Sequence, residues 1–514
     1  MELSELQQIR LDKAERLRES GVDPYASRSH RTISTADAIA QFEGREVLEG
    51  GPEPTPQELT VAGRIVSFRD MGKTLFAHVR DGAGDLQLYV RLNDVGEEQH
   101  QAFSTLVDLG DVVEATGTLF RTRTGEVTLR VSSFRILTKA LNAPPEKRHG
   151  LRDRELRYRH RYADLIANAD VRTVFRLRSA LTHAIRQFLH DDGFMEVETP
   201  SLQPLYGGAA ARPFTTHYNA LGNEFYLRIA DELYLKRLIV GGFERVFEIC
   251  KDYRNEGMDR THSPEFTMLE WYEAYGDYLT VLERLERLFA YISETVLGGS
   301  TFTNDGHTID LATPWRRLTF REAIREYSGI DYTDYPESID LIRVAREAGA
   351  EIETGTVWAR VVDELHKQFV RPNLIQPTVL MDYPVALSPL AKRTPGDPTH
   401  AERFQLIVAG TEMTNAFTEL NDPLDQLARF QAQQHDREAG DQDAMPIDED
   451  FVNALMYGMP PTGGIGIGID RLVMTLTDQP TIRDVILFPA MRPLGSHAPD
   501  SDLDVDEVSG NGDE

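Results

Sequence analysis

The sequence predicts a multidomain α+β protein, in which a small five-stranded β-domain precedes a larger domain of helices interleaved with strands. At 514 residues the chain is longer than the ~250 to 300 residues that a single hydrophobic core serves. The texture changes from short alternating runs over residues 59–138 to longer helical periods afterwards. A content of 41% hydrophobic and 27% charged residues is ordinary for a globular protein, so we expect a sizeable core.

The N-terminal segment, residues 1–58, is expected to be a helical extension followed by a linker. Apolar residues recur near helical spacing over residues 2–20, and Gly21 stands where such a helix would end. Residues 50–58 are rich in Pro and Gly, which is typical of a linker.

The next segment, residues 59–140, is expected to be an all-β domain. Turn signals such as Asp81-Gly82 and Thr124-Gly125 separate short alternating runs. Five short strands in this arrangement suggest an OB-fold β-barrel. The strands are expected at residues 59–68, 74–80, 85–91, 111–120 and 126–136.

Three further segments complete the predicted organisation. Residues 141–165 form a basic connector that holds Arg152, Arg154, Arg157 and Arg159. Residues 166–495 form the larger domain, whose longest helices are expected at 171–193, 277–297, 358–370 and 424–440. The acidic segment 496–514 is nearly free of apolar residues, and we expect it to be disordered.

Composition favours a cytoplasmic protein. Cys250 is the single cysteine, so no intrachain disulfide can form and a reducing setting is favoured. The chain begins with polar and charged residues, and no apolar run reaches the ~18 to 20 residues of a membrane span. The net charge of -28 argues, taken alone, against a polyanionic partner, although the connector is locally basic.

The densest group of chemically active residues lies between residues 254 and 272. It includes the cations Arg254 and His262, the carboxylates of Glu256, Glu265 and Glu270, and the aromatic residues Phe266, Trp271 and Tyr272. Apolar stretches at residues 246–250 and from Phe266 onward flank the polar middle, so it reads as a loop between two antiparallel strands. Such a loop can bind a charged substrate.

A second candidate segment, residues 466–474, is a glycine-rich strand that runs into a helix with Arg471 at the junction. Glycines allow a flat ligand to approach the backbone, and a guanidinium can stack over an aromatic ring. Without other motifs, a packed strand with a salt-bridged arginine is an equally good interpretation.

Together with residues 193–200, these two segments resemble the three signature motifs of class II aminoacyl-tRNA synthetases. Within that class, residues 262–267 (His-Ser-Pro-Glu-Phe-Thr) and 415–422 (Asn-Ala-Phe-Thr-Glu-Leu-Asn-Asp) look like the lysyl branch. The resemblance covers roughly residues 1–495. It implies a catalytic domain built on an antiparallel β-sheet flanked by helices, and a homodimer formed through the first motif.

The resemblance also implies a two-step ligase that joins L-lysine to tRNA(Lys) with ATP. Carboxylates must replace the water that a lysine ammonium loses on binding. By resemblance, Glu270 and Glu419 contact the side-chain ammonium. The other implied lysine-binding residues are Gly208 and Glu232 for the α-amino group, and Tyr272, Asn415 and Phe417 around the pocket.

For ATP, the resemblance implies that Arg254 and Arg471 are the catalytic arginines. Arg254 would neutralise the α-phosphate and the substrate carboxylate, which repel each other as they react. Phe266 and Arg471 would sandwich the adenine. Glu256, His262 and Glu412 complete the implied ATP-binding set.

Mg²⁺ is the implied cofactor, because divalent cations that bridge phosphates take oxygen ligands. Glu412 matches one of the family's two metal-binding carboxylates. The other position departs from the family pattern, because Gln405 stands where an acidic residue is usual. We expect weaker metal binding there and retained activity.

The barrel domain resembles the family's anticodon-binding OB-fold, in which aromatic stacking and hydrogen bonds read unpaired bases. Arg69, Phe76, Gln87 and Glu126 fall at the matching positions. Burial of Phe76 in the barrel core is the alternative interpretation.

Two rival functions stay open on the sequence. One is a class II relative that lysylates a protein; such relatives lack the OB-domain, so residues 59–138 weigh against it. The other is a degenerate relative that binds nucleotide or RNA but has no charging activity. Gln405 gives this alternative slight support. An aspartyl-type enzyme is disfavoured because Glu270 and Glu419 would repel an acidic substrate.

Overall fold

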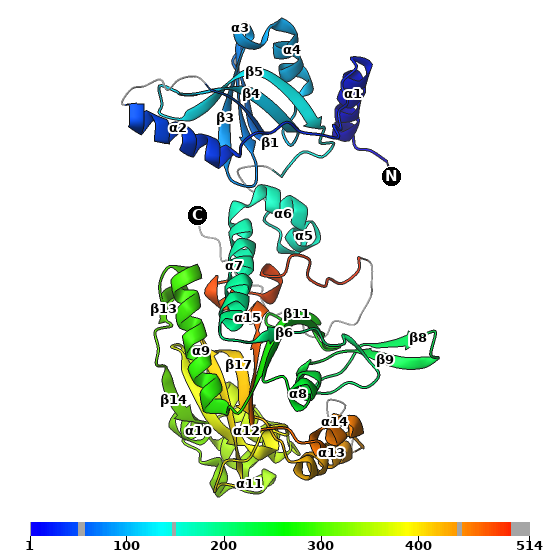
Figure 1. Cartoon of the computed structure of the whole chain (residues 1–514), viewed down its shortest axis with the longest axis vertical. Coiled ribbons are helices and arrows are strands. Elements are labelled where there is room, and N and C mark those ends of the chain that lie inside the picture. Colours follow the sequence, from blue (N-terminus) through cyan, green and yellow to red (C-terminus); the bar gives the residue numbers. More distant parts are fainter. Residues whose placement is uncertain (1, 50–56, 146–150, 439–444, 495–514) are drawn as a thin grey trace. The chain divides into compact units, whose positions relative to one another are not determined.

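A computed structural model describes residues 2–49, 57–145, 151–438 and 445–494 of the chain (Figure 1). Two compact units form, Met1–Arg152 and Asp153–Glu514. Most of the predicted linker and all of the predicted acidic tail lie outside the described residues. Within the described residues, no helix is both long and apolar enough to cross a membrane.

The first unit is a closed five-stranded barrel with the strand order β1-β2-β3-β5-β4. Its pairs are antiparallel except β3 with β5, which run parallel. The apolar side chains of alternate strand positions fill its core. All five predicted strands are confirmed, and the elements are α1 Glu5–Glu19, α2 Thr35–Glu49, β1 Glu58–Asp70, β2 Thr74–Arg80, β3 Asp85–Arg91, α3 Leu92–Val95, α4 Glu97–Leu106, β4 Val112–Arg121 and β5 Val127–Thr138.

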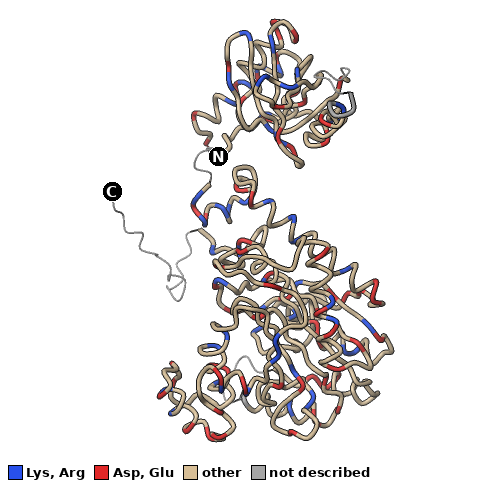
Figure 2. Tube along the Cα trace, turned by 90° about the vertical axis from the view of Figure 1, so that its left-hand side faces the viewer, with Lys and Arg blue, Asp and Glu red and all other residues tan. Residues whose placement is uncertain are grey.

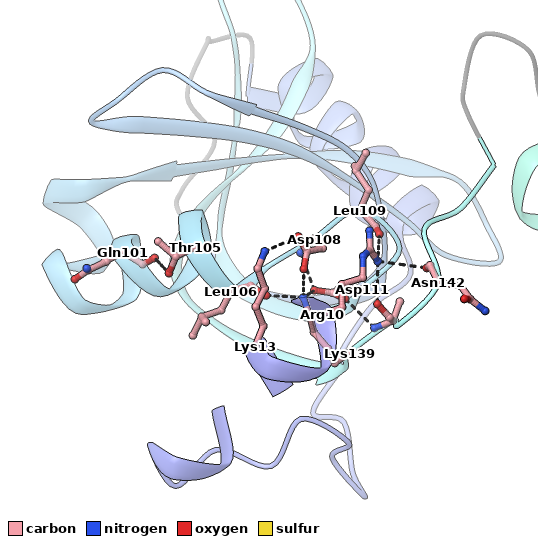
Figure 3. Close-up of polar contacts among 11 residues, drawn as sticks. Arg10, Lys13, Gln101, Thr105, Leu106, Asp108, Leu109, Asp111, Lys139 and Asn142 are labelled. Atoms are coloured by element: carbon pink, nitrogen blue, oxygen red, sulfur yellow. Dashed lines mark hydrogen bonds and ion pairs between the residues drawn. The ribbon is translucent and has the colours of Figure 1, made fainter. Parts of the chain in front are cut away.

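Helix α1 is the predicted N-terminal helix, and buried polar contacts attach it to the barrel (Figure 3). Ser4 caps its start in a capping box with Gln7, and Gly21 follows its end at a φ of 80°. Arg10 is buried and donates through Nη1 to the backbone oxygens of Leu109 and Ala140, at 3.0 and 2.8 Å.

A fully buried lysine, Lys139, lies beside this attachment (Figure 3). Its Nζ is 2.5 Å from Asp108 Oδ2, 2.7 Å from Asp111 Oδ2 and 2.6 Å from the Leu106 oxygen. Lys13, on α1, pairs with the other oxygen of Asp108 at 2.7 Å. The cluster therefore joins the end of β5 to the loop that precedes β4.

The second unit is built on an eight-stranded sheet with the order β14-β15-β16-β17-β18-β11-β10-β6 (Figure 1). The six central strands are antiparallel, as predicted, whereas the two edge pairs, β14 with β15 and β10 with β6, are parallel. The sheet strands are β6 Met195–Glu196, β10 Arg245–Tyr253, β11 Glu265–Ala274, β14 Arg316–Thr319, β15 Thr378–Pro384, β16 His400–Val408, β17 Thr411–Thr418 and β18 Thr462–Gly468.

Helices cover both faces of this sheet, because strand side chains alternate between the faces. Apolar residues such as Phe247, Trp271 and Ile465 form one core with α7 Ala169–Asp191, α9 Tyr278–Ile292 and α15 Ile469–Leu476. Their strand neighbours, including Tyr272 and Phe417, face α8 Glu232–Val240, α13 Pro423–Glu438 and α14 Glu449–Met456. The predicted helices are thus confirmed, and α9 continues as a π-helical turn over Ser293–Leu297.

Further helices and short strands complete this unit. A third core packs α10, α11 and α12 beside β15. The predicted helix over 358–370 is α12 followed by a π-helical turn, His366–Val370. The bounds are α5 Arg154–Arg159, α6 Arg161–Ala167, β7 Leu202–Gln203, β8 Thr215–Tyr218, β9 Asn223–Leu227, β12 Thr301–Asn304, β13 His307–Asp310, α10 Phe320–Ser328, α11 Ser338–Glu347 and α12 Trp358–Leu365.

Candidate active site

The register of three central strands brings distant parts of the sequence into one row. Glu270 on β11 pairs with Gly466 on β18, and Gly466 pairs with Asn415 on β17. In the next row Tyr272 pairs with Gly464, and Gly464 with Phe417. The predicted hairpin, glycine strand and lysyl-type segment therefore meet on one face of the sheet.

The glycines of β18 leave room for these larger neighbours. A Cβ atom on Gly464 would overlap Glu419 Oε1 and the ring of Tyr272. A Cβ on Gly466 would lie 2.8 Å from the methyl carbon of Met268. Glycine is needed at position 464 because a side chain there would occupy the space of Glu419 and Tyr272. The reason expected from the sequence was different, namely room for a flat ligand to approach the backbone.

A cavity of about 310 Å³ opens over this face. Every residue that the sequence assigns to ATP lines it, and so does every residue assigned to lysine except Glu419. The predicted residues in its wall are Gly208, Glu232, Arg254, Glu256, His262, Phe266, Glu270, Tyr272, Glu412, Asn415, Phe417 and Arg471.

One end of the cavity is acidic and buried. Glu270 is 6% exposed, and the hydroxyl of Tyr272 donates to its Oε2 at 2.8 Å. Burial, together with the charges of the neighbouring Glu232 and Asp252, raises the pKa of Glu270 to about 8. This end therefore favours a cationic group that can repay the desolvation of these carboxylates.

Glu419 lies outside the cavity wall and is fully buried. Its Oε2 contacts Nζ of Lys236, and the same Nζ is 2.5 Å from Glu232 Oε1. Asn415, in contrast, is held at the wall, because Arg403 Nε donates to its Oδ1 at 2.8 Å. That contact turns the amide nitrogen of Asn415 away from Arg403.

The other end of the cavity carries its cations. The guanidinium of Arg254 stands 5.0 Å from the centre of the Phe266 ring, and its Nε donates to the Ile229 oxygen. Arg471 Nη2 lies 2.9 Å from His262 Nε2, and His262 Nδ1 lies 2.7 Å from Asp259 Oδ2. These arginines and the histidine suit an anionic ligand with a flat ring.

The two candidate metal residues differ in position. Glu412 lines the cavity, and its carboxylate accepts no hydrogen bond from the described residues. Gln405 is 5% exposed, lies outside the wall, and accepts a hydrogen bond from the Tyr383 hydroxyl at 2.7 Å. Glu412 thus fits a divalent cation, whereas the amide oxygen of Gln405 is already engaged.

The sequence did not reveal the residues that hold the motifs together. Arg178 on α7 contacts Asp470 Oδ1 at 2.5 Å and Thr267 Oγ1 at 2.9 Å, while the Thr267 amide donates to Asp470 Oδ2 at 2.6 Å. These bonds fix β11 against the start of α15. Arg178 is one arginine on a helix with several, so sequence spacing offered no signal.

Cys250 is buried, and burial raises the pKa of its thiol. A neutral, desolvated thiol is a poor nucleophile.

Comparison with known families places this site in context. A model of the class II tRNA synthetases (D, K and N) matches residues 153–492. The chain belongs to this family. A model of the OB-fold nucleic acid binding domain matches residues 59–137. The resemblance drawn from the three motifs and the predicted fold class are therefore both confirmed.

Relatives in this synthetase family match nearly the whole chain. The lysine–tRNA ligase of Roseiflexus sp. (strain RS-1) is 53% identical over 494 residues, which cover 96% of this chain and 100% of the relative. The lysine–tRNA ligase of Chloroflexus aurantiacus is 50% identical over 493 residues, covering 96% and 99%. That of Pelotomaculum thermopropionicum is 49% identical over 494 residues, covering 96% of both.

In the OB-fold unit of this synthetase, the four predicted anticodon residues lie near one another on the outside of the barrel. Arg69 on β1 pairs with Phe76 on β2, and Phe76 is half-buried on the outer face. Gln87 Nε2 donates to Glu126 Oε2 at 2.7 Å. Phe76 therefore does not belong to the barrel core.

Further aromatic and polar residues extend this outer face. The ring of Tyr89 lies 5.2 Å from that of Phe76 and 5.6 Å from that of Phe120. His78 Nε2 lies 2.8 Å from Glu126 Oε1. Their outward positions follow from strand alternation, which was the available signal.

The part of the predicted basic connector that lies in the second unit is neutralised in part by acidic residues of the same segment. Arg157 and Arg161 both pair with Asp164, at 2.9 and 2.6 Å, and Arg159 pairs with Glu155. Basic and acidic positions are interspersed over both units (Figure 2). The segment from Arg157 to Arg161 thus offers less free positive charge than its composition indicates.

Proposed function

We propose that this chain is a lysine–tRNA ligase, which activates L-lysine with ATP and transfers it to the 3′ end of tRNA(Lys). The observation that carries the proposal is the buried acidic end of the cavity, with Glu270 and Glu232 in its wall and Arg254 further along it. This layout suits an amino acid with two ammonium groups and one carboxylate. The names of the relatives support the same substrate.

Lysine recognition rests on the attraction between the ammonium groups of the substrate and buried carboxylates of the cavity. The ε-ammonium would pair with Glu270, whose Oε2 is oriented by Tyr272. Asn415 and Phe417 shape the pocket, while Glu232 and the Gly208 backbone take the α-amino group. Glu419 acts from behind the wall, through its contact with Lys236.

Activation is a displacement at phosphorus. A carboxylate oxygen of lysine attacks the α-phosphorus of ATP, the bond to the bridging oxygen breaks, and pyrophosphate leaves. Arg254 would bind both the attacking carboxylate and the α-phosphate, which lowers the repulsion between two anions. Arg471 would bind at the adenine, with Glu256, His262 and Phe266 as further nucleotide contacts. Positioning and charge neutralisation supply the catalysis.

Glu412 would hold Mg²⁺ at the phosphates, because its carboxylate lies in the cavity wall. When bound, Mg²⁺ would neutralise phosphate charge and help pyrophosphate to leave. Gln405 would contribute weakly, since Tyr383 already donates to its amide oxygen. The usual acidic residue at this position would add a second negative ligand.

In the second step the terminal ribose hydroxyl of tRNA attacks the carbonyl carbon of lysyl-adenylate, and AMP leaves. The outer face of the barrel would hold the anticodon. Phe76 supplies a stacking surface, while Arg69, Gln87 and Glu126 supply hydrogen-bonding groups at its edge.

A homodimer in the cytoplasm is the corresponding assembly. The first motif and the residues just after it present exposed apolar side chains, with Met195 41% and Leu202 42% exposed. Contact with a second copy would cover such residues. The described part of the chain needs no oxidising compartment, because its cysteine is single and buried.

The proposal is tested by ATP–pyrophosphate exchange with each amino acid in turn, followed by charging of tRNA(Lys). We expect exchange with lysine and transfer of lysine to the tRNA. Exchange with lysine but transfer only to protein would favour the protein-lysylating alternative. Nucleotide or RNA binding without exchange would favour the non-charging alternative, and exchange with aspartate would contradict the lysine assignment.

A further inference from the structure

A second buried lysine, Lys236, lies directly behind the acidic end of the cavity. It is fully buried on α8, and its Nζ contacts Glu232 Oε1 at 2.5 Å and Glu419 Oε2. The same Nζ stands 5.4 Å from the centre of the Phe417 ring. The chain's own ammonium group therefore shares partners with the residues proposed to bind substrate lysine.

A buried ammonium is costly unless anions surround it, and buried carboxylates are costly unless a cation does. Desolvation lowers the pKa of Lys236, but Glu232 and Glu419 raise it above its usual value. Burial raises the pKa values of Glu232 and Glu419, and Lys236 opposes that rise. Without Lys236, these carboxyl groups would hold protons more strongly.

Other charged groups around the cluster leave Lys236 as its main cation. Arg403, from β16, also lowers the pKa of Glu232, but less than Lys236 does. The groups that face the cluster from β11 and from the residue before α8 add no positive charge, because Glu270 and Asp231 are carboxylic acids and Tyr272 is a neutral phenol. Removal of Lys236 would therefore leave acidic groups facing one another.

We propose that Lys236 is a positioning residue for lysine recognition, which keeps Glu232 and Glu419 ionised and oriented before the substrate arrives. This inference rests on the proposed function. Glu232 contacts Lys236 through Oε1, so Oε2 remains for the α-ammonium of the substrate. Glu270, which has no contact with Lys236 among the described residues, remains for the ε-ammonium. The resident cation thus helps the pocket select a substrate with two ammonium groups.

The barrel provides a matched control. Lys139 is also fully buried and also binds two carboxylates, Asp108 and Asp111, but these residues line no described cavity. Replacing Lys139 should change stability alone. Replacing Lys236 should change how lysine binds.

The test compares Lys236→Gln and Lys139→Gln in lysine-dependent ATP–pyrophosphate exchange across pH 6.5 to 9. Glutamine can still donate hydrogen bonds but carries no charge. For Lys236→Gln we expect a lysine KM at least about tenfold above wild type at pH 7, since one pKa unit is a tenfold change in an equilibrium constant. The ATP KM should stay nearly constant, and Lys139→Gln should leave both KM values unchanged.

The pH dependence of the lysine KM distinguishes a positioning role of Lys236 from general damage to the pocket. In Lys236→Gln the carboxyl groups keep protons that substrate lysine must displace, so the ratio of its lysine KM to that of wild type should fall as pH rises. A ratio that is constant with pH, or an unchanged lysine KM, would overturn the proposal. Equal losses for lysine and ATP would do the same.

A conservative variant covers the case in which Lys236→Gln does not fold. Lys236→Arg keeps a cation between Glu232 and Glu419, so it should fold and keep a lysine KM near that of wild type at pH 7. A Lys236→Arg variant that folds but has a large, pH-independent rise in the lysine KM would refute the inference. Absence of lysine-dependent exchange in the wild-type enzyme would instead refute the proposed function.

Discussion

Arg471 Nη2 lies 2.9 Å from His262 Nε2, although these residues are 209 positions apart in the chain. An arginine can only donate, so Nε2 of His262 must be the acceptor. The proton of the imidazole is then on Nδ1, where it points to Asp259 Oδ2 at 2.7 Å. Asp259 therefore fixes the tautomer that holds a proposed ATP-binding arginine.

His262→Ala should weaken ATP binding and leave lysine binding nearly unchanged. Hydrogen bonds to charged groups contribute about 1.5 to 3 kcal/mol, which corresponds to roughly a 10- to 150-fold higher ATP KM. Exchange kinetics with each substrate varied in turn would measure this. Asp259→Asn, which leaves the ring in place, should give a smaller effect of the same kind, and a comparable rise in the lysine KM would refute the assignment.

Glu270 should release a proton when lysine binds. Burial is the main reason that its pKa is raised to about 8, so at pH 7 most molecules carry the proton. An incoming ammonium favours the ionised carboxylate, so the affinity for lysine should rise as pH increases from 6 to 8 and level off above the raised pKa. Titration calorimetry in two buffers of different ionisation enthalpy would count the protons. The Glu270→Gln variant should bind lysine poorly and release no proton from position 270. Proton release that persists in this variant would show that the proton comes from another group.

Gly464→Ala should impair lysine binding, because the added methyl group would overlap Glu419 Oε1 and the Tyr272 ring. Overpacking of this kind costs about 1 to 3 kcal/mol. Gly468→Ala is the matched control on the same strand, since its nearest neighbour is an Arg471 side-chain atom at 3.8 Å. We expect a larger rise in the lysine KM for Gly464→Ala than for the control, and equal effects would show that the glycines are not needed for space.

Gln405→Glu should lower the Mg²⁺ concentration needed for half-maximal adenylate formation. A carboxylate would restore the negative charge that is usual at this position. Glu412→Gln is the matched opposite change, and it should raise the required Mg²⁺ concentration. An unchanged magnesium dependence in Gln405→Glu would count against a role for position 405 in metal binding.

Phe76→Ala should impair tRNA charging while sparing lysine-dependent exchange. Stacking of a base on an aromatic ring contributes about 1 to 3 kcal/mol, so the KM for tRNA should rise roughly 5- to 150-fold. Aminoacylation kinetics with varied tRNA would measure the change. Equal damage to exchange would show that Phe76 acts on the fold and not on the tRNA.

Strand alternation and turn signals were sufficient to predict the barrel and the central hairpin. The periodicity of a strand is set by its own backbone, so β2 and β3 begin and end as the sequence predicted. The parallel edge pairs could not be predicted in this way, because the direction of a neighbouring strand depends on the connection between them. The π-helical turns after α9 and α12 likewise have no simple pattern.

The sequence predicted the residues of the candidate site that belong to motifs. It did not predict the residues whose role depends on tertiary contacts. Glu270 and Arg254 stood out by their place in dense polar segments. Lys236 did not, because a lysine four residues after a glutamate on a helix is typical of an exposed ion pair. Its burial against Glu419 depends on the packing of α8 on the sheet. The same reason explains why Asp470 was missed as the link between β11 and α15.

The most direct test of the proposed function is aminoacylation of tRNA(Lys) by the wild-type chain with labelled lysine, ATP and Mg²⁺. We predict that lysine accumulates on the 3′ end of this tRNA and that an aspartate-accepting tRNA stays uncharged. Lysine-dependent pyrophosphate exchange without any charging of tRNA(Lys) would contradict the account.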